Sequence, residues 1–144
     1  MRLALDAARQ VSDSDVPVGA VVLTATGQVI AQAANQRQAT DDPFAHAEML
    51  ALSQASQALG SWRMDDCTLV VTLEPCAMCA GAISQTRLQR LVFGAYDPKA
   101  GAVSSLFDLL RDPRLPHRVE VIAGVLETDC QAILRDFFED KRSS

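Results

Sequence analysis

The feature that most constrains this chain is a pair of short motifs, His46-Ala47-Glu48 and Pro75-Cys76-Ala77-Met78-Cys79. Together they supply an imidazole, two thiols and one additional carboxylate. An imidazole and two thiolates form a three-ligand zinc set, which leaves one tetrahedral position open, as a catalytic zinc requires. We therefore expect His46, Cys76 and Cys79 to bind one Zn²⁺, and Glu48 to carry protons beside it.

The spacing within each motif indicates how the chain reaches one ion. Cys76 and Cys79 are three residues apart, so on a helix they share one face. Pro75 suits the first position of that helix, where its missing N–H costs nothing. His46 and Glu48 are two residues apart and can share an ion only if it lies beyond a helix end. The motifs therefore predict two helix N-termini pointing at one metal, where the helix dipoles favour thiolates.

A Cys-x-x-Cys pair alone is also typical of redox sites and structural zinc sites. A redox pair would leave His46 and Glu48 unused, and a structural zinc needs a fourth ligand. Cys67 begins the strand predicted to end at Leu73, which places it about 20 Å from Cys76. Cys130 lies in a distant C-terminal segment. A catalytic zinc is the favoured interpretation, with Cys67 and Cys130 as reduced core thiols.

The bulk properties favour one globular domain over residues 1–144. Hydrophobic residues make up 49% of the 144 positions, which is enough for a real core. No apolar run approaches the roughly 20 residues of a membrane span. Asp6 interrupts the N-terminal stretch before a signal peptide can form. We therefore expect a cytoplasmic protein that has no membrane partner.

Charge is unevenly distributed along the chain, whose net charge is −5. Residues 84–118 carry six basic and three acidic side chains, whereas both flanking segments are net acidic. A patch in this segment could contact phosphates. Solvated helix and loop surface is an equally good interpretation from the sequence.

Hydrophobic periodicity predicts alternating strands and helices after an initial hairpin, which is an α/β layered sheet with a parallel part. The predicted strands are 18–23, 29–34, 68–73, 88–94 and 119–123. The predicted helices are 2–12, 44–59, 76–86, 104–110 and 128–138. Both helices that carry the motifs follow a strand or loop at one sheet edge, where ligands usually bind in such folds.

Longer segments around the motifs resemble a known family. H-x-E…P-C-x-x-C is the signature of zinc-dependent nucleobase deaminases. Residues 16–20, 45–48, 71–82 and 93–101 are similar to bacterial tRNA-specific adenosine deaminases, in the cytidine deaminase-like superfamily. The resemblance implies a three-layer fold with a five-stranded mixed sheet flanked by helices. It implies a homodimer that converts adenosine to inosine at the wobble position of a tRNA anticodon, typically an arginine tRNA. Zinc-activated water would be the nucleophile and Glu48 the proton shuttle.

The resemblance also implies roles for four further residues, each of which has a simpler interpretation. Asn35 would hydrogen-bond the flipped base, although Asn also favours turns. Val18 would pack on the purine or simply belong to the core. Asp97 would lie near the nucleotide backbone or cap its own loop before Pro98. Phe138 would close the site from the last helix or serve as a core aromatic.

Two other functions are compatible with the same residues. A small-molecule deaminase acting on guanine or cytosine would use the same metal set, and the acidic balance favours it slightly. A non-catalytic zinc-binding interaction module would have no use for the unliganded carboxylate of Glu48. Inosine formed in tRNA, rather than turnover of free bases, would distinguish the first alternative.

Overall fold

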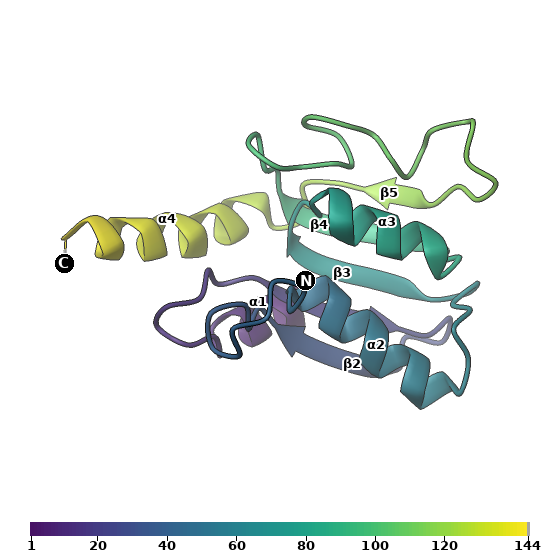
Figure 1. Cartoon of the computed structure of the whole chain (residues 1–144), viewed down its shortest axis with the longest axis horizontal. Coiled ribbons are helices and arrows are strands. Elements are labelled where there is room, and N and C mark those ends of the chain that lie inside the picture. The colour runs from purple at the N-terminus through teal and green to yellow at the C-terminus, as the bar shows by residue number, and fades with distance from the viewer. Residues whose placement is uncertain (144) are drawn as a thin grey trace.

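Five strands form one mixed sheet in the computed structural model, which describes residues 1–143. The sheet order is β2-β1-β3-β4-β5 (Figure 1). The strands are β1 (Gly19–Leu23), β2 (Val29–Ala34), β3 (Thr68–Leu73), β4 (Arg90–Ala95) and β5 (Glu120–Ile122). β1 is antiparallel to β2 and β3, whereas β3, β4 and β5 are parallel. The predicted mixed sheet is confirmed, with each strand boundary within two residues of the prediction.

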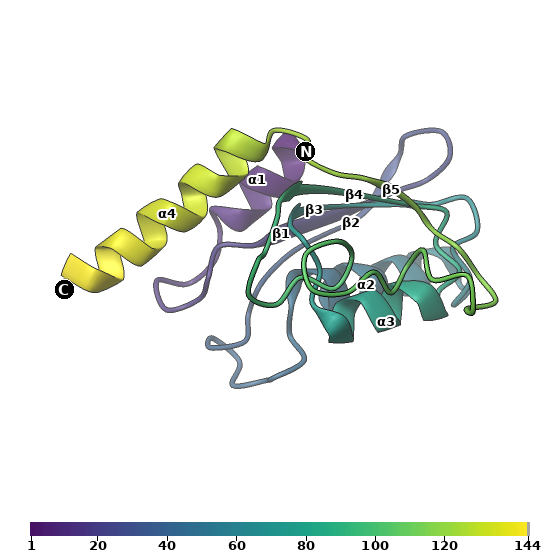
Figure 2. The ribbon, with the colours of Figure 1, turned by 90° about the horizontal axis from the view of Figure 1, so that it is seen from above.

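Helices cover both faces of the sheet, which gives the predicted three layers. α2 (Ala47–Leu59) and α3 (Ala77–Gln85) lie on one face, while α1 (Arg2–Ala8) and α4 (Glu127–Ser143) lie on the other (Figure 2). Successive side chains of a strand point to opposite faces. Leu69 and Val71 therefore join the large core cluster on the α2 and α3 side, whereas Val70 packs with Ala4 of α1.

The α4 helix packs on β4 at its first turns and then projects beyond the sheet (Figures 1 and 2). Its one fully buried side chain among the described residues is Cys130. Gly94 makes this packing possible, because a Cβ there would come within 2.3 Å of the Cys130 sulfur. No helix within residues 1–143 is long and apolar enough to cross a bilayer.

Helix boundaries differ more from the prediction than strand boundaries do. α1 ends at Ala8 rather than at residue 12, because Ser12 and Asp15 close a hydrogen-bonded turn through both backbone and side chain. α2 starts at Ala47 rather than at residue 44, because His46 is extended, with φ −74° and ψ 150°. The last helix is longer than predicted and continues to Ser143.

The predicted helix over residues 104–110 is wrong, since that segment consists of turns and irregular backbone. Its first N–H groups do not pair with carbonyls one turn earlier. Those of Ser104 and Ser105 donate instead to the carboxylate of Glu74, each at 2.8 Å. A distant side chain therefore takes the donors that a helix would need.

Candidate active site

The two motifs meet at the carboxyl end of β3, each at the start of a helix. His46 is the N-cap of α2 and Cys76 is the N-cap of α3. Both caps have extended backbone, which turns their side chains past the helix end toward each other. Cys79 lies in the first turn of α3 and Glu48 in the first turn of α2. Two positive helix ends thus converge on one point, as the spacing predicted.

The three expected metal ligands have spacings that fit one zinc ion. His46 Nδ1 lies 3.7 Å from Cys76 Sγ and 3.5 Å from Cys79 Sγ. All three ligand atoms lie within 4.8 Å of one another. Ordinary Zn–N and Zn–S bond lengths at tetrahedral angles give an N···S separation of about 3.6 Å. Cys67 and Cys130, the other two cysteines, are buried elsewhere as free thiols.

The Cys76 thiol gives up its proton readily before any ion binds, and its hydrogen bond with His46 raises the pKa of that imidazole. Hydrogen bonds from Cys79 and His46 outweigh burial and lower the pKa of the Cys76 thiol to about 3. The hydrogen bond to Cys76, together with burial, raises the pKa of the Cys79 thiol. One thiolate therefore lies beside a thiol whose proton a divalent cation would displace.

Glu48 is the motif residue that does not belong to the three-ligand set. Its side chain is 5% exposed and lines the same cavity as His46 and Cys76. Burial, as the largest influence, raises the pKa of the Glu48 carboxyl. A carboxyl group with a raised pKa can both accept and return a proton near neutral pH.

A cavity of about 460 Å³ opens over these residues. All four residues assigned to substrate from the sequence line it: Val18, Asn35, Asp97 and Phe138. Val18 is buried at 8% exposure, whereas Phe138 is 48% exposed and stacks edge-on against Phe137. The structure therefore brings all four to the metal end of the sheet.

Asn35 has a fixed orientation. Its Nδ2 donates to the Val16 carbonyl at 3.1 Å, and its Oδ1 accepts the Arg37 N–H at 3.1 Å. The turn-forming role is therefore real, but the amide nitrogen has a second hydrogen. Because Asn35 also lines the cavity, that hydrogen is available to an acceptor on a ligand.

Asp97 caps its own loop, as the simpler interpretation predicted. Its Oδ1 accepts the N–H groups of Lys99 and Ala100, at 3.1 and 3.2 Å. Its other carboxylate oxygen accepts no hydrogen bond from the described residues 1–143. Loop capping and a ligand contact therefore remain compatible.

Sequence reasoning assigned no cavity role to several residues that line it, among them Arg37, Tyr96, Lys99 and Leu134. Arg37 follows Asn35 closely, so a search of residues next to the predicted base contact would have found it. Tyr96 is 43% exposed and meets the buried Phe93 edge-on at 5.2 Å. Leu134 gives no signal in the sequence, because it depends on where α4 packs.

Most of the basic side chains in residues 84–118 do not face this cavity. Arg90, Arg111 and Arg114 form ion pairs with Glu120, Asp108 and Asp112. Arg87 and Arg118 precede β4 and β5, at the amino ends of the parallel strands, opposite the metal end. Lys99 lines the cavity, and Arg37 joins it from outside the segment. Positive charge near the site therefore comes from two separate loops.

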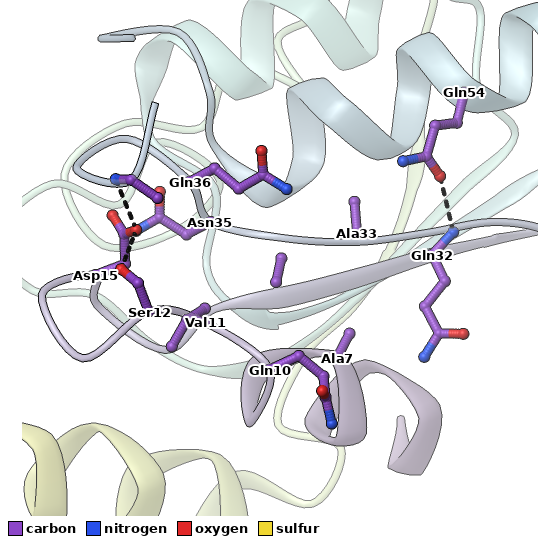
Figure 3. Close-up of a pocket in the computed structure, with 12 residues that line it drawn as sticks. Ala7, Gln10, Val11, Ser12, Asp15, Gln32, Ala33, Asn35, Gln36 and Gln54 are labelled. Carbon is purple, nitrogen blue, oxygen red and sulfur yellow. Dashed lines mark hydrogen bonds between the residues drawn. The ribbon is translucent and has the colours of Figure 1, made fainter. Parts of the chain in front are cut away.

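A second, polar groove of about 580 Å³ runs along the outer edge of β2, between α1 and α2 (Figure 3). Figure 3 shows Ser12 bonded to Asp15, and Gln54 bonded to the backbone of Gln32. Asp15 is fully buried and accepts the N–H groups of Gln38 and Ala39, at 2.6 and 3.1 Å. Burial would raise the pKa of Asp15, but these hydrogen bonds outweigh it and lower the pKa. Asp15 thus fixes the loop that leads to His46.

Comparisons with known proteins agree with this geometry. Residues 1–95 match the family model for the cytidine and deoxycytidylate deaminase zinc-binding region. The chain is 46% identical to the tRNA-specific adenosine deaminase of Bacillus subtilis over 143 residues, covering 99% of this chain and 88% of the relative. It is also 46% identical to the tRNA-specific adenosine deaminase of Agrobacterium fabrum, covering 99% of this chain and 93% of the relative.

Solved structures give the same result. One from work on A-to-I editing by tRNA deaminases at the wobble position superposes with a TM-score of 0.88 and 43% identity, covering 93% of this chain and 97% of that one. A guanine deaminase from Nitrosomonas europaea has a TM-score of 0.69 and 29% identity, covering 84% of this chain and 72% of that one. With its zinc ligands in place and this similarity over nearly its whole length, the chain belongs to the tRNA-specific adenosine deaminase family.

Proposed function

We propose that this protein hydrolyses adenosine to inosine at the wobble position of a tRNA anticodon, releasing ammonia. The observation that carries the proposal is a buried carboxylate, Glu48, at the base of the cavity and beside a three-ligand zinc set. His46, Cys76 and Cys79 would hold a Zn²⁺ ion, which would supply a water molecule of lowered pKa as the nucleophile near neutral pH.

Glu48 moves the protons that the reaction requires. Deamination of adenosine consumes water, puts its oxygen on C6 of the purine and expels the amino group. Glu48 takes a proton from the nucleophile, gives it to the ring nitrogen next to C6, and assists departure of ammonia. Its burial supports this role, because a raised pKa lets one carboxyl act as base and then as acid.

The cavity walls hold the base in place. Val18 packs against the purine face, and the second amide hydrogen of Asn35 donates to a ring nitrogen of the base. Asp97 and Phe138 contact the nucleotide from the loop after β4 and from α4. Because the base must leave its stack to enter, a loop nucleotide is a better substrate than a paired one.

Arg37 and Lys99 line the cavity and can bind phosphates. Because a free base has no phosphate, these two cations favour an RNA substrate. We further propose that the tRNA is an arginine tRNA and that the protein works in the cytoplasm as a homodimer.

The test is incubation of the zinc-loaded protein with total tRNA, followed by nucleoside analysis for inosine. Glu48→Gln should bind zinc normally and lose about 10²- to 10⁴-fold in activity, which is the usual contribution of a general acid–base group. Ammonia released from free guanine, with no inosine in tRNA, would favour the guanine deaminase alternative, whose fold is similar. Unimpaired activity of the variant would exclude the role given to Glu48.

A further inference from the structure

A third buried carboxylate, Glu74, lies between β3 and the zinc ligand Cys76 and takes no part in the proton transfers described above. It is 2% exposed, and among the described residues it has no ion pair with Lys or Arg. Burying an unpaired anion is costly unless hydrogen bonds replace the lost water. The donors that replace it come from one distant segment, residues 97–105.

Both oxygens of Glu74 are occupied. Oε2 accepts the N–H groups of Val103, Ser104 and Ser105, at 3.2, 2.8 and 2.8 Å. Oε1 accepts the N–H of Asp97 at 3.0 Å and the hydroxyl of Ser105. These hydrogen bonds outweigh burial, which alone would raise the pKa of the Glu74 carboxyl, and hold that pKa below its ordinary value. One side chain therefore ties both ends of the segment.

The middle of the segment is shaped around the same carboxylate. A Cβ on Gly101 would lie 2.3 to 2.4 Å from the carboxylate carbon and both oxygens, closer than real contacts allow. Gly101 has no unusual backbone conformation, so space alone requires glycine here. The backbone adds a further tie, because Ala102 N–H donates to the Pro75 carbonyl at 2.9 Å.

The tied segment forms one wall of the substrate cavity through Asp97, Pro98, Lys99 and Ala100. Cys76, which is two residues beyond Glu74, and Glu48 of α2 line the same cavity. We propose that Glu74 is a positioning residue for the substrate: by holding the Asp97 N–H at the carboxyl end of β3, it sets the distance between the segment that contacts the nucleotide and the zinc ligands. This inference rests on the proposed function, because the wall is assigned to an RNA nucleotide.

Glu74→Gln tests the tie at one known atom. A glutamine has one acceptor oxygen, and three N–H groups converge on the Oε2 position, so the amide oxygen belongs there. The NH₂ group then faces the Asp97 N–H, where two donors oppose each other, while the Ser105 hydroxyl can rotate to accept. The variant thus breaks the Asp97 hydrogen bond and retains the others.

The first readout is hydrogen exchange of backbone amides in the zinc-loaded protein, which requires no substrate. In Glu74→Gln the Asp97 amide should exchange at least about tenfold faster, while the amides of Leu91 and Phe93 in β4 keep their rates. Unchanged protection at Asp97 would overturn the proposal whatever the enzyme's substrate. If the Asp97 amide loses protection in Glu74→Gln but the wild-type protein forms no inosine in tRNA, the proposed function is refuted while the role of Glu74 in holding Asp97 stands.

The second readout is steady-state deamination of tRNA. Glu74→Gln should raise KM roughly tenfold with kcat within about threefold of wild type, since it removes binding rather than chemistry. Gly101→Ala should show the same pattern, because the added methyl displaces the carboxylate. Gly81→Ala is the matched control: a Cβ there meets nothing within 4 Å, so KM should not change.

A double-mutant cycle separates positioning from general stabilisation. Asp97→Ala keeps the backbone N–H that Glu74 holds and removes only the side chain assigned to the nucleotide. If Glu74 acts by positioning that side chain, the KM increase caused by Glu74→Gln should fall below about twofold in the Asp97→Ala background. The same factor in both backgrounds would mean that Glu74 only supports the fold, and would overturn the proposal. Zinc content and melting temperature of each variant are measured in parallel.

Discussion

The buried acidic side chains gather at the end of the sheet where β3 and β4 finish, whereas the end where these strands begin has ion-paired acidic side chains at the surface. Asp15, Glu48 and Glu74 are all at most 5% exposed and all lie at the finishing end. The starting end carries the ion pairs Arg63–Asp65, Arg90–Glu120 and Arg114–Asp112, whose arginine side chains are all exposed and whose partners are neighbours in sequence or lie on the adjacent strand. Such pairs contribute at most about 1 kcal/mol each.

The difference shows that, within residues 1–143, this fold removes carboxylates from water only at the metal end of the sheet, where hydrogen-bond donors replace the lost water for Asp15 and Glu74. Asp15 and Glu74 recruit backbone N–H groups from distant segments, and each thereby fixes a loop that borders the cavity. An exposed pair can be rebuilt with water, but a buried acceptor that loses its donors cannot. Substitutions at the finishing end should therefore damage function specifically, and those at the starting end should be tolerated.

The largest contrast is expected between two cysteines at the two ends of β3. Cys76→Ala should lose zinc and activity, and it should be markedly less stable, because metal binding is coupled to folding. Cys67→Ser should retain one zinc per chain and full activity, with a stability loss of about 1 kcal/mol from placing a hydroxyl in an apolar site. Elemental analysis and thermal unfolding measure both effects. Full zinc in Cys76→Ala would show that another ligand set is used.

The metal end could be predicted largely from short motifs, because its key positions are local. Pro75 and the three-residue spacing of the cysteines place a helix start, and the spacing of His46 and Glu48 requires an ion beyond a helix end. The predictions failed where one side chain acts over a long sequence distance. Glu74 is adjacent to the motif, and nothing local indicates that its partners are residues 97–105, so the segment after Val103 was wrongly predicted to be helical.

An intermediate effect is expected for Asn35. Asn35→Ala should lower kcat/KM for tRNA roughly ten- to a hundredfold, since it removes a donor in the cavity and leaves the Val16 carbonyl and Arg37 N–H without their partner. Thr24→Ala is the matched change at the other end. It removes a comparable side chain–backbone hydrogen bond, to the Gln28 N–H in the hairpin turn, and should change kcat/KM less than twofold.

Zinc content should stay at the wild-type level in both of these variants. Equal losses of activity from Asn35→Ala and Thr24→Ala would remove the functional distinction between the two ends. A loss confined to Asn35→Ala, measured on tRNA and on a short anticodon stem-loop alike, would assign Asn35 to the base itself rather than to the rest of the RNA.

The smallest effect concerns the cations, and it tests whether sequence position or place in the fold decides RNA contact. Lys99 and Arg114 both belong to the net basic segment 84–118, but Lys99 lines the cavity and Arg114 pairs with Asp112 at 2.6 Å in a turn that precedes β5. Each phosphate contact to single-stranded RNA contributes about 0.7 to the slope of log affinity against log salt. Lys99→Glu should therefore weaken tRNA binding severalfold at low salt, reduce the slope by about one contact, and act equally on every tRNA, since phosphates carry no sequence information.

Arg114→Glu should leave affinity and slope nearly unchanged, because it alters a surface ion pair at the end of the sheet away from the metal. Salt titrations of tRNA binding by both variants provide the measurement. A larger loss from the Arg114 variant would show that RNA extends over the starting end of the sheet, and the contrast between the two ends would then describe the chemistry but not the binding surface.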